Sequence, residues 1–211
     1  GEQTAALIRE RGGEALYVRA DVTDPESVRG YVDATTTAYG RIDAFANNAG
    51  YEGAVTATTD YPIDVFDRVM AVNVRGVFLG LKYVLPIMQA QRSGAVINTG
   101  STGSHVGAPG VCAYTASKHA VLGLTRTAAL EAARFGVRVN AICPGGTQTR
   151  MLRSLSEGRS KDEELAFNLA TPNGRVAEPD EIAAMVLFLA SDHARHMVGQ
   201  YVIVDGGRLA M

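Results

Sequence analysis

The sequence predicts an α/β fold in which a doubly wound parallel sheet is covered by helices on both faces. Short apolar runs alternate with helical tracts along most of the 211 residues. These runs are too uniformly hydrophobic to have one face in water, as expected of strands buried on both sides. Polar or glycine-rich segments follow the runs, and in a doubly wound sheet such segments gather at the carboxyl ends of the strands and bind ligands.

Composition limits the possible partners and suggests one compartment. The chain carries 20 Lys and Arg against 22 Asp and Glu, with a formal net charge of −2 and no basic block. We therefore expect neither nucleic acid nor an anionic membrane as a partner. The first residues form a polar segment rather than a signal peptide, and we expect a cytoplasmic protein. Cys112 and Cys143 lack CxxC spacing, so we expect two reduced thiols.

The first predicted elements are a helix, a strand, a second helix and a second strand. Residues 2–11 read as a helix, since Gly12 and Gly13 supply the left-handed positions that commonly close one. The apolar run 15–20 predicts a strand. Pro25 follows capping residues and predicts a helix over 25–39. The run 42–46 predicts the next strand, which ends in a polar loop.

The remaining elements continue the alternation. Apolar residues over 62–92 recur at helical spacing, which predicts one long or twice-started helix. The other expected elements are strands at 94–99, 137–142 and 201–204, a long helix at 113–134 and a helix at 178–190. The polar region 147–177 either covers a ligand as a lid or packs as a small helix pair. The whole chain reads as one domain.

Tyr114 and Lys118 form the first candidate for chemistry. Four residues apart near the start of a helix, their side chains leave the same face and can reach one ligand. An unperturbed phenol has a pKa near 10 and is a poor acid or base at neutral pH. An adjacent ammonium favours the phenolate, so we expect Lys118 to lower the pKa of Tyr114. The alternative is a surface tyrosine lying over a lysine stem.

Ser101 and Asn73 are weaker candidates when each is taken alone. Ser101 follows a predicted strand, where its hydroxyl could donate to the substrate oxygen that Tyr114 protonates. It could equally be an ordinary turn serine. Asn73 lies in an apolar helical tract, where a buried amide without partners costs about 1 to 3 kcal/mol. A core asparagine with satisfied hydrogen bonds is the alternative. All these residues nevertheless converge on one edge of the predicted sheet.

The ordered set of motifs closely resembles the short-chain dehydrogenase/reductase family. The resemblance covers essentially all 211 residues. Its motifs, in chain order, are Asp21-Val22, Asn47-Asn48-Ala49-Gly50, Asn73, Ser101, Tyr114-x-x-x-Lys118 and Pro144-Gly145. Thr147 departs mildly from the family pattern, which commonly has Val or Ile at that position.

The resemblance implies a role for each matched residue. Tyr114 would be the acid/base, Lys118 would also hold the nicotinamide ribose, Ser101 would orient the carbonyl or alcohol, and Asn73 would support a water in a proton relay. The implied cofactor is NAD or NADP, and no metal is expected. The residues implied in cofactor binding, besides Tyr114 and Lys118, are Asp21, Val22, Asn48, Ala49, Gly50, Pro144, Gly145, Thr147 and Thr149.

Members of the family begin with a strand and a turn of the form Thr-Gly-x-x-x-Gly-x-Gly, which receives the cofactor pyrophosphate. This motif does not occur in the 211 residues. By comparison with the family we therefore expect an N-terminally truncated sequence that lacks the first two strands and this turn. We also expect the chain as given to bind NAD(H) or NADP(H) weakly and to turn over little.

The resemblance implies an NAD(P)-dependent enzyme that interconverts a secondary alcohol and a ketone, and a homotetramer. An apolar pocket near Tyr114 would suit a cyclic or aliphatic substrate. Four histidines show no metal-ligand spacing: His105, His119, His193 and His196. The alternative function is that of a truncated, non-catalytic polypeptide that acts only as a structural or assembly partner.

Overall fold

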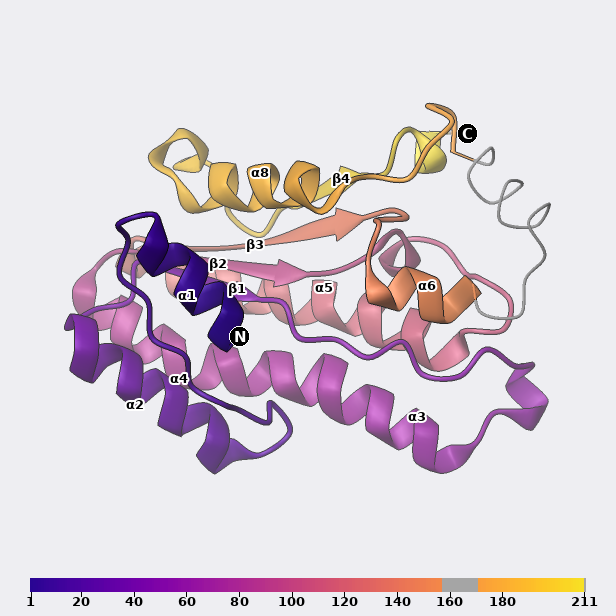
Figure 1. Ribbon diagram of the computed structural model, residues 1–211, viewed down its shortest axis with the longest axis horizontal. Coiled ribbons are helices and arrows are strands. Elements are labelled where there is room, and N and C mark those ends of the chain that lie inside the picture. Colours follow the sequence, from indigo (N-terminus) through magenta and orange to yellow (C-terminus); the bar gives the residue numbers. More distant parts are fainter. Residues whose placement is uncertain (157–170, 211) are drawn as a thin grey trace.

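The computed structural model describes residues 1–156 and 171–210, and it contains a parallel sheet with strand order β1-β2-β3-β4 (Figure 1). Each strand lies beside the next in sequence, as the α/β prediction requires. The strands are β1 (Ala44–Asn47), β2 (Gly94–Thr99), β3 (Val137–Pro144) and β4 (Tyr201–Val204). The predicted fold class is confirmed.

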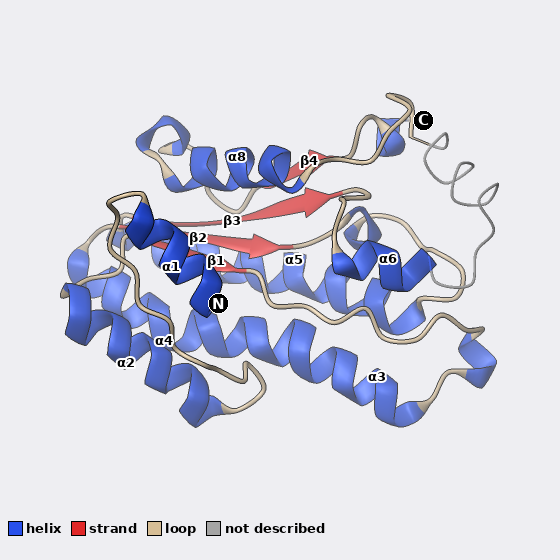
Figure 2. Ribbon diagram, in the orientation of Figure 1, coloured by secondary structure: helices blue, strands red, loops and turns tan. Residues whose placement is uncertain are grey.

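Helices cover both faces of the sheet (Figure 2). On one face, α4 (Gly76–Gln91) and α5 (Cys112–Ala132) bury Val84 and Val121 against Val139 of β3. On the other face, α8 (Pro179–Ala190) buries Leu189 against β2 and β3. The other helices are α1 (Glu2–Glu10), α2 (Pro25–Tyr39), α3 (Ile63–Met70) and α6 (Arg150–Ser156).

Local capping signals explain where α2 begins and ends. The Asp24 side chain accepts a hydrogen bond from the backbone N–H of Glu26 at 3.1 Å, and Pro25 occupies the first helical turn. Gly40 ends the helix in the left-handed conformation at φ 74°. The helix predicted over 25–39 therefore has the bounds that these residues indicate.

The predicted tract 62–92 is one continuous helical rod whose middle turn is π-helical rather than α-helical. A π-helical turn, Ala71–Arg75, joins α3 to α4. The whole rod, Ile63–Gln91, is long and apolar enough by composition to cross a membrane. Much of that apolarity belongs to α4, which packs Val77, Leu81 and Val84 into the core beside the sheet.

The predicted strand 15–20 is wrong. Residues 13–20 run without strand hydrogen bonds, and Leu16, Tyr17 and Val18 are exposed. An apolar run becomes a strand only when a neighbouring strand offers backbone partners, and within the described residues the sheet ends at β1. Val22, just beyond this run, packs against Gly76 of α4.

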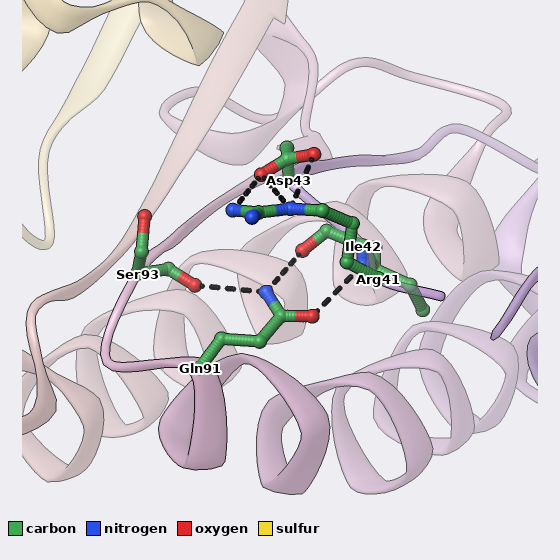
Figure 3. A network of polar contacts seen from close by, with 5 residues as sticks. All are labelled: Arg41, Ile42, Asp43, Gln91 and Ser93. Carbon is green, nitrogen blue, oxygen red and sulfur yellow. Dashed lines mark hydrogen bonds and ion pairs between the residues drawn. The ribbon is translucent and has the colours of Figure 1, made fainter. Parts of the chain in front are cut away.

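Gln91, the last residue of α4, fixes the start of the first strand (Figure 3). Its side-chain oxygen accepts from the backbone N–H of Ile42 at 2.9 Å. Its amide nitrogen donates to the carbonyl oxygen of Ile42 at 2.8 Å and to that of Ser93 at 3.2 Å. The segment that enters β1 is thereby joined to the turn between α4 and β2.

Arg138 of β3 performs a similar function at the end of α8. Its guanidinium donates to four backbone carbonyl oxygens, at 2.7 to 3.3 Å, on Leu189, Ala190, Ser191 and Ala194. The last carbonyls of a helix have no partners within it and carry partial negative charge, so the half-buried Arg138 cation stabilises them. This contact attaches α8 to the sheet.

Candidate active site

The structure brings the four predicted catalytic residues to one edge of the sheet. Ser101 follows β2 after one glycine, and Tyr114 and Lys118 lie in the first turns of α5. Asn73 lies at the centre of the π-helical turn. Three separate segments therefore supply the site, and the carboxyl end of β2 lies between them.

Asn73 is fully buried and every polar atom of its side chain has a partner. Its Oδ1 accepts from the backbone N–H of Tyr51 at 2.7 Å. Its Nδ2 donates to the Tyr51 carbonyl at 2.9 Å and to Ser117 Oγ at 3.0 Å. Asn73 thus binds both the loop after β1 and α5, and its hydrogen bonds are those of a satisfied core asparagine, so its role in a proton relay stays a prediction.

Ser117 continues this network to Tyr114. Its hydroxyl accepts from Asn73 and donates to the backbone carbonyl of Tyr114 at 2.7 Å. Ser117 is fully buried. The position of the first turn of α5 relative to the π-helical turn is therefore set by directed hydrogen bonds as well as by packing.

Lys118 is a buried cation. Its side chain is 3% exposed, and Nζ donates to the carbonyl oxygen of Thr99 at 2.7 Å. Nζ lies 5.5 Å from the centre of the Tyr114 ring. Burial lowers the pKa of Lys118 from 10.5 to about 8, because a charged ammonium loses its hydration inside the protein. The alternative of a surface tyrosine over a lysine stem is wrong.

The pKa of the Tyr114 phenol shifts in the direction opposite to the prediction. Burial raises this pKa, a hydrogen bond with the Ser101 side chain lowers it, and negative charge at Glu52 raises it further. On burial the phenolate would lose more hydration free energy than the hydrogen bond with Ser101 restores, so the net shift of the pKa is upward. The spacing of Tyr114 and Lys118 shows that they are neighbours, but it does not show how deeply the phenol is buried.

Ser101 lies beside Tyr114, and its hydroxyl is hydrogen bonded with the phenol. Its backbone is extended, with φ −169°, and its Oγ accepts from the Gly103 N–H at 3.1 Å. One lone pair of the oxygen is thereby used, and the O–H and the second lone pair stay available for the hydrogen bond with the phenol. A Cβ atom on Gly103 would lie 3.6 Å from Ser101 Oγ and 3.7 Å from the Tyr114 ring.

Gly50 lies against the polar centre of the site. A Cβ atom at this position would be 3.7 Å from both Asn73 Oδ1 and Lys118 Nζ. Its neighbour Asn48 accepts a hydrogen bond from Thr99 Oγ1 at 2.9 Å. The loop after β1 therefore follows the end of β2 closely, and glycine keeps the space beside Lys118 open.

Asp21, Val22 and Ala49 line one open pocket. The Asp21 carboxylate accepts from the N–H and the hydroxyl of Thr23, both at 2.8 Å, and these hydrogen bonds lower its pKa. Thr23 is in turn held by the Arg75 guanidinium, which donates to its carbonyl. Three of the residues implied in cofactor binding thus meet although they come from two loops.

The segment after β3 lies along the carboxyl end of β4. Gly145 donates to the Val204 carbonyl at 2.9 Å, and a Cβ atom on Gly145 would lie 2.9 Å from Asp205 Cα. Thr147 pairs with Ala177 in a short bridge. The other implied residues here are Pro144, the last residue of β3, and Thr149, which precedes α6.

The predicted lid 147–177 is described at its two ends. Met151 of α6 reaches the site, since its Cε lies 3.8 Å from where a Cβ on Gly50 would be. Residues 157–170, which include Leu165, Phe167 and Leu169, lie outside the described residues. The choice between a lid and a packed helix pair therefore stays a prediction for that part.

Three polar residues that organise the site were not among the predicted site residues: Thr99, Ser104 and Ser117. Thr99 accepts the Lys118 hydrogen bond through its backbone, so its residue type carries no signal. Ser117 could have been found, because it lies three residues after Tyr114 on the same helix.

Comparison with known proteins identifies the family. A family model described as enoyl-(acyl carrier protein) reductase matches residues 1–208. The chain is 43% identical to levodione reductase of Leifsonia aquatica, over 99% of this chain and 79% of that protein. The chain belongs to the short-chain dehydrogenase/reductase family. It is also 38% identical to cyclopentanol dehydrogenase of Comamonas sp. (strain NCIMB 9872), over all of this chain and 83% of that protein.

Solved structures agree with this assignment. A crystal structure of levodione reductase superposes with a TM-score of 0.95 at 42% identity, covering 99% of this chain and 83% of the other. A structure of NAD+-bound xylitol dehydrogenase superposes with a TM-score of 0.91 at 37% identity, covering 98% and 84%. The family membership implied by the motifs is confirmed, and with it an oxidoreductase class and a nicotinamide cofactor.

Proposed function

We propose that this chain is an NAD(P)-dependent oxidoreductase that interconverts a secondary alcohol and a ketone. The observation that carries the proposal is the buried Lys118 ammonium beside the Tyr114 ring, with the Ser101 side chain hydrogen bonded to the phenol. Burying a cation costs free energy, and ionisable groups with strongly shifted pKa values are concentrated at functional sites. Two relatives named as a reductase of levodione and a dehydrogenase of cyclopentanol support the reaction class.

The described residues fit a dinucleotide, NAD or NADP. Gly50 leaves space beside Lys118 that a side chain would reduce, and Asp21, Val22 and Ala49 line a pocket at the same end of the sheet. Lys118 would hold the nicotinamide ribose, with the 48–50 loop on the adenosine side and Gly145, Thr147 and Thr149 on the nicotinamide side. When bound, the cofactor would supply or accept the hydride.

The protein itself controls the proton. Tyr114 gives a proton to the substrate oxygen in ketone reduction and takes one in alcohol oxidation. Ser101 donates a hydrogen bond to that same oxygen and stabilises its developing charge. Lys118 donates to the Thr99 carbonyl beside the Tyr114 ring, and Asn73 keeps the loop after β1 against α5.

The substrate proposed for this site is a cyclic or aliphatic secondary alcohol and its ketone. Loops 51–56 and 106–111 join through a hydrogen bond from Thr56 N to the Gly110 carbonyl, at 2.9 Å. Val55 and Val106 on these loops have exposed apolar side chains, and both residues precede Tyr114 in the sequence. Such side chains favour a ring or alkyl group over a charged one.

Tyr114→Phe tests the proposal. Both reactions should fall by orders of magnitude, because the acid/base group is lost, while the affinity for NAD(H) or NADP(H) measured by calorimetry should change little. Tyr39→Phe, an exposed tyrosine at the end of α2, is the matched control. A Tyr114→Phe variant with wild-type turnover would remove Tyr114 from the mechanism. A wild-type chain without turnover at saturating cofactor would favour the assembly-partner alternative.

We further propose a cytoplasmic homotetramer. The family resemblance implies this assembly, and α4 and α5 leave large apolar side chains uncovered, with Phe78 47% and Leu130 80% exposed. Exposed apolar side chains on adjacent helices favour association. Sedimentation should give four copies, and a strictly monomeric protein at micromolar concentration would contradict the assembly.

A further inference from the structure

Ser104, a residue that the mechanism does not use, fixes the loop that carries Ser101. Ser104 is 4% exposed and ends the short helical turn Thr102–Ser104. Its Oγ accepts from the Ser101 backbone N–H at 3.1 Å, while the Ser104 N–H donates to the Ser101 carbonyl at 2.9 Å. These reciprocal hydrogen bonds fix the backbone of Ser101 at both ends.

Cys143, near the end of β3, supports Ser104 in turn. Its thiol is fully buried, which raises its pKa, while hydrogen bonding with the Ser101 backbone and the Ser104 side chain lowers it. A Cβ atom on Gly100 would lie 2.8 Å from Cys143 Sγ and 3.1 Å from Ser104 Oγ, so only glycine allows this approach. The end of β3 therefore sets the position of the loop after β2.

The hydrogen bonds of this turn determine how the Ser101 hydroxyl is oriented. Its Oγ accepts from the Gly103 N–H, which belongs to the same helical turn, so any rotation of the turn moves the lone pairs of the hydroxyl. The same hydroxyl is hydrogen bonded with Tyr114, whose ring and Ser101 Oγ would lie 3.7 Å and 3.6 Å from a Cβ atom on Gly103. Without the hydrogen bond to the Ser104 side chain, Ser101 would stay in the site but its hydroxyl would be free to rotate.

We propose that Ser104, anchored on Cys143, is a positioning residue that directs the Ser101 hydroxyl at Tyr114. The catalytic part of this inference rests on the proposed function. The structural part, the hydrogen bond between Ser101 and the phenol, can be measured without any reaction.

The test is an NMR comparison of Ser104→Ala, Ser101→Ala and the double variant. Each is the 211-residue chain with its tyrosines labelled with carbon-13 at Cζ. The Tyr114 signal is assigned with Tyr114→Phe, and its chemical shift reports the hydrogen bond to the phenol. Ser104→Ala should move this signal in the same direction as Ser101→Ala and by a smaller amount. The double variant should match Ser101→Ala, because Ser104 acts only through Ser101.

The kinetic expectation follows from the same geometry. Ser104→Ala should lower kcat about tenfold with little change in KM, less than the loss expected for removing an oxyanion donor outright. Thr125→Ala is the matched control. It removes another buried hydroxyl, one bonded to Asn98 on β2, and should lower the melting temperature without moving the Tyr114 signal or kcat.

Each outcome decides between the two proposals. An unchanged Tyr114 signal in Ser104→Ala, or additive shifts in the double variant, would overturn the positioning role. If Ser104→Ala does not fold, Cys143→Ala is the second variant, with a smaller shift in the same direction expected and an unchanged signal contradicting the anchor. A wild-type chain that is saturated with cofactor and lacks turnover, but shows the expected shifts, would overturn the proposed function and leave the positioning intact.

Discussion

Lys118 predicts an unusual dependence of stability on pH. Its pKa is about 8 in the folded protein because burial removes hydration from the ammonium, against 10.5 for an ordinary lysine. Between these two values the unfolded chain binds more protons than the folded one. The free energy of unfolding therefore rises with pH through this window, and the Lys118 penalty is fully present below pH 8.

The size of the effect follows from the two pKa values. One pKa unit corresponds to about 1.4 kcal/mol, so a protonated Lys118 lowers the free energy of unfolding at pH 7 by about 3 kcal/mol. Most of this, about 2 to 3 kcal/mol, returns by pH 10. The raised pKa of Tyr114 acts in the opposite sense, since the stability it contributes is lost above pH 10, and the measurement should stop there.

Urea unfolding of the wild type and of Lys118→Met, at pH 7, 8, 9 and 10, measures this effect. Methionine fills a similar volume and has no charge to titrate. Loss of the hydrogen bond to Thr99 contributes an offset that does not depend on pH. The stability of the wild type relative to the variant should rise by about 2 to 3 kcal/mol over this range. A difference that stays flat with pH would refute the buried, shifted ammonium.

Three further substitutions test other contacts in the structure. Arg138→Met should lower the free energy of unfolding by about 2 to 3 kcal/mol in urea titrations, because four carbonyls at the end of α8 lose a charged donor. Arg175→Met, which breaks an exposed ion pair, should change it little, and equal effects would contradict the cap. Gln91→Ala should cost about 1 to 2 kcal/mol in the same assay, while the exposed control Arg41→Ala should cost less; the reverse order would be inconsistent with Figure 3. Gly50→Ala should leave the melting temperature near that of the wild type but weaken cofactor binding in calorimetry, and unchanged affinity would place the cofactor elsewhere.

Elements with strong local signals were predictable from the sequence. Asp24, Pro25 and Gly40 define both ends of α2 by short-range hydrogen bonding and backbone preference, and these forces act within one helical turn. The four catalytic candidates were also placed at the correct edge of the sheet, because parallel strands end on the same side. In both cases the relevant distance along the chain is short or the topology is restrictive.

Properties that depend on distant packing were not predictable. Residues 15–20 have the composition of a strand, but strand formation needs hydrogen-bonding partners from elsewhere in the chain. The direction of the Tyr114 pKa shift depends on desolvation by surrounding segments, which spacing does not report. The π-helical turn likewise leaves no signature in the apolar periodicity of 62–92.

That turn has a consequence for how this region can change. A π-helical turn contains one more residue than the α-helical turn it replaces, so it shifts the phase of everything on one side of it by about 100°. Deleting one residue from 71–75 would restore a regular helix, but it would turn α3 relative to α4 and carry Asn73 away from Tyr51 and Ser117. The rod therefore tolerates exchange of its side chains more readily than any change in its length. The number of residues in the π-helical turn helps to set the geometry of the candidate site.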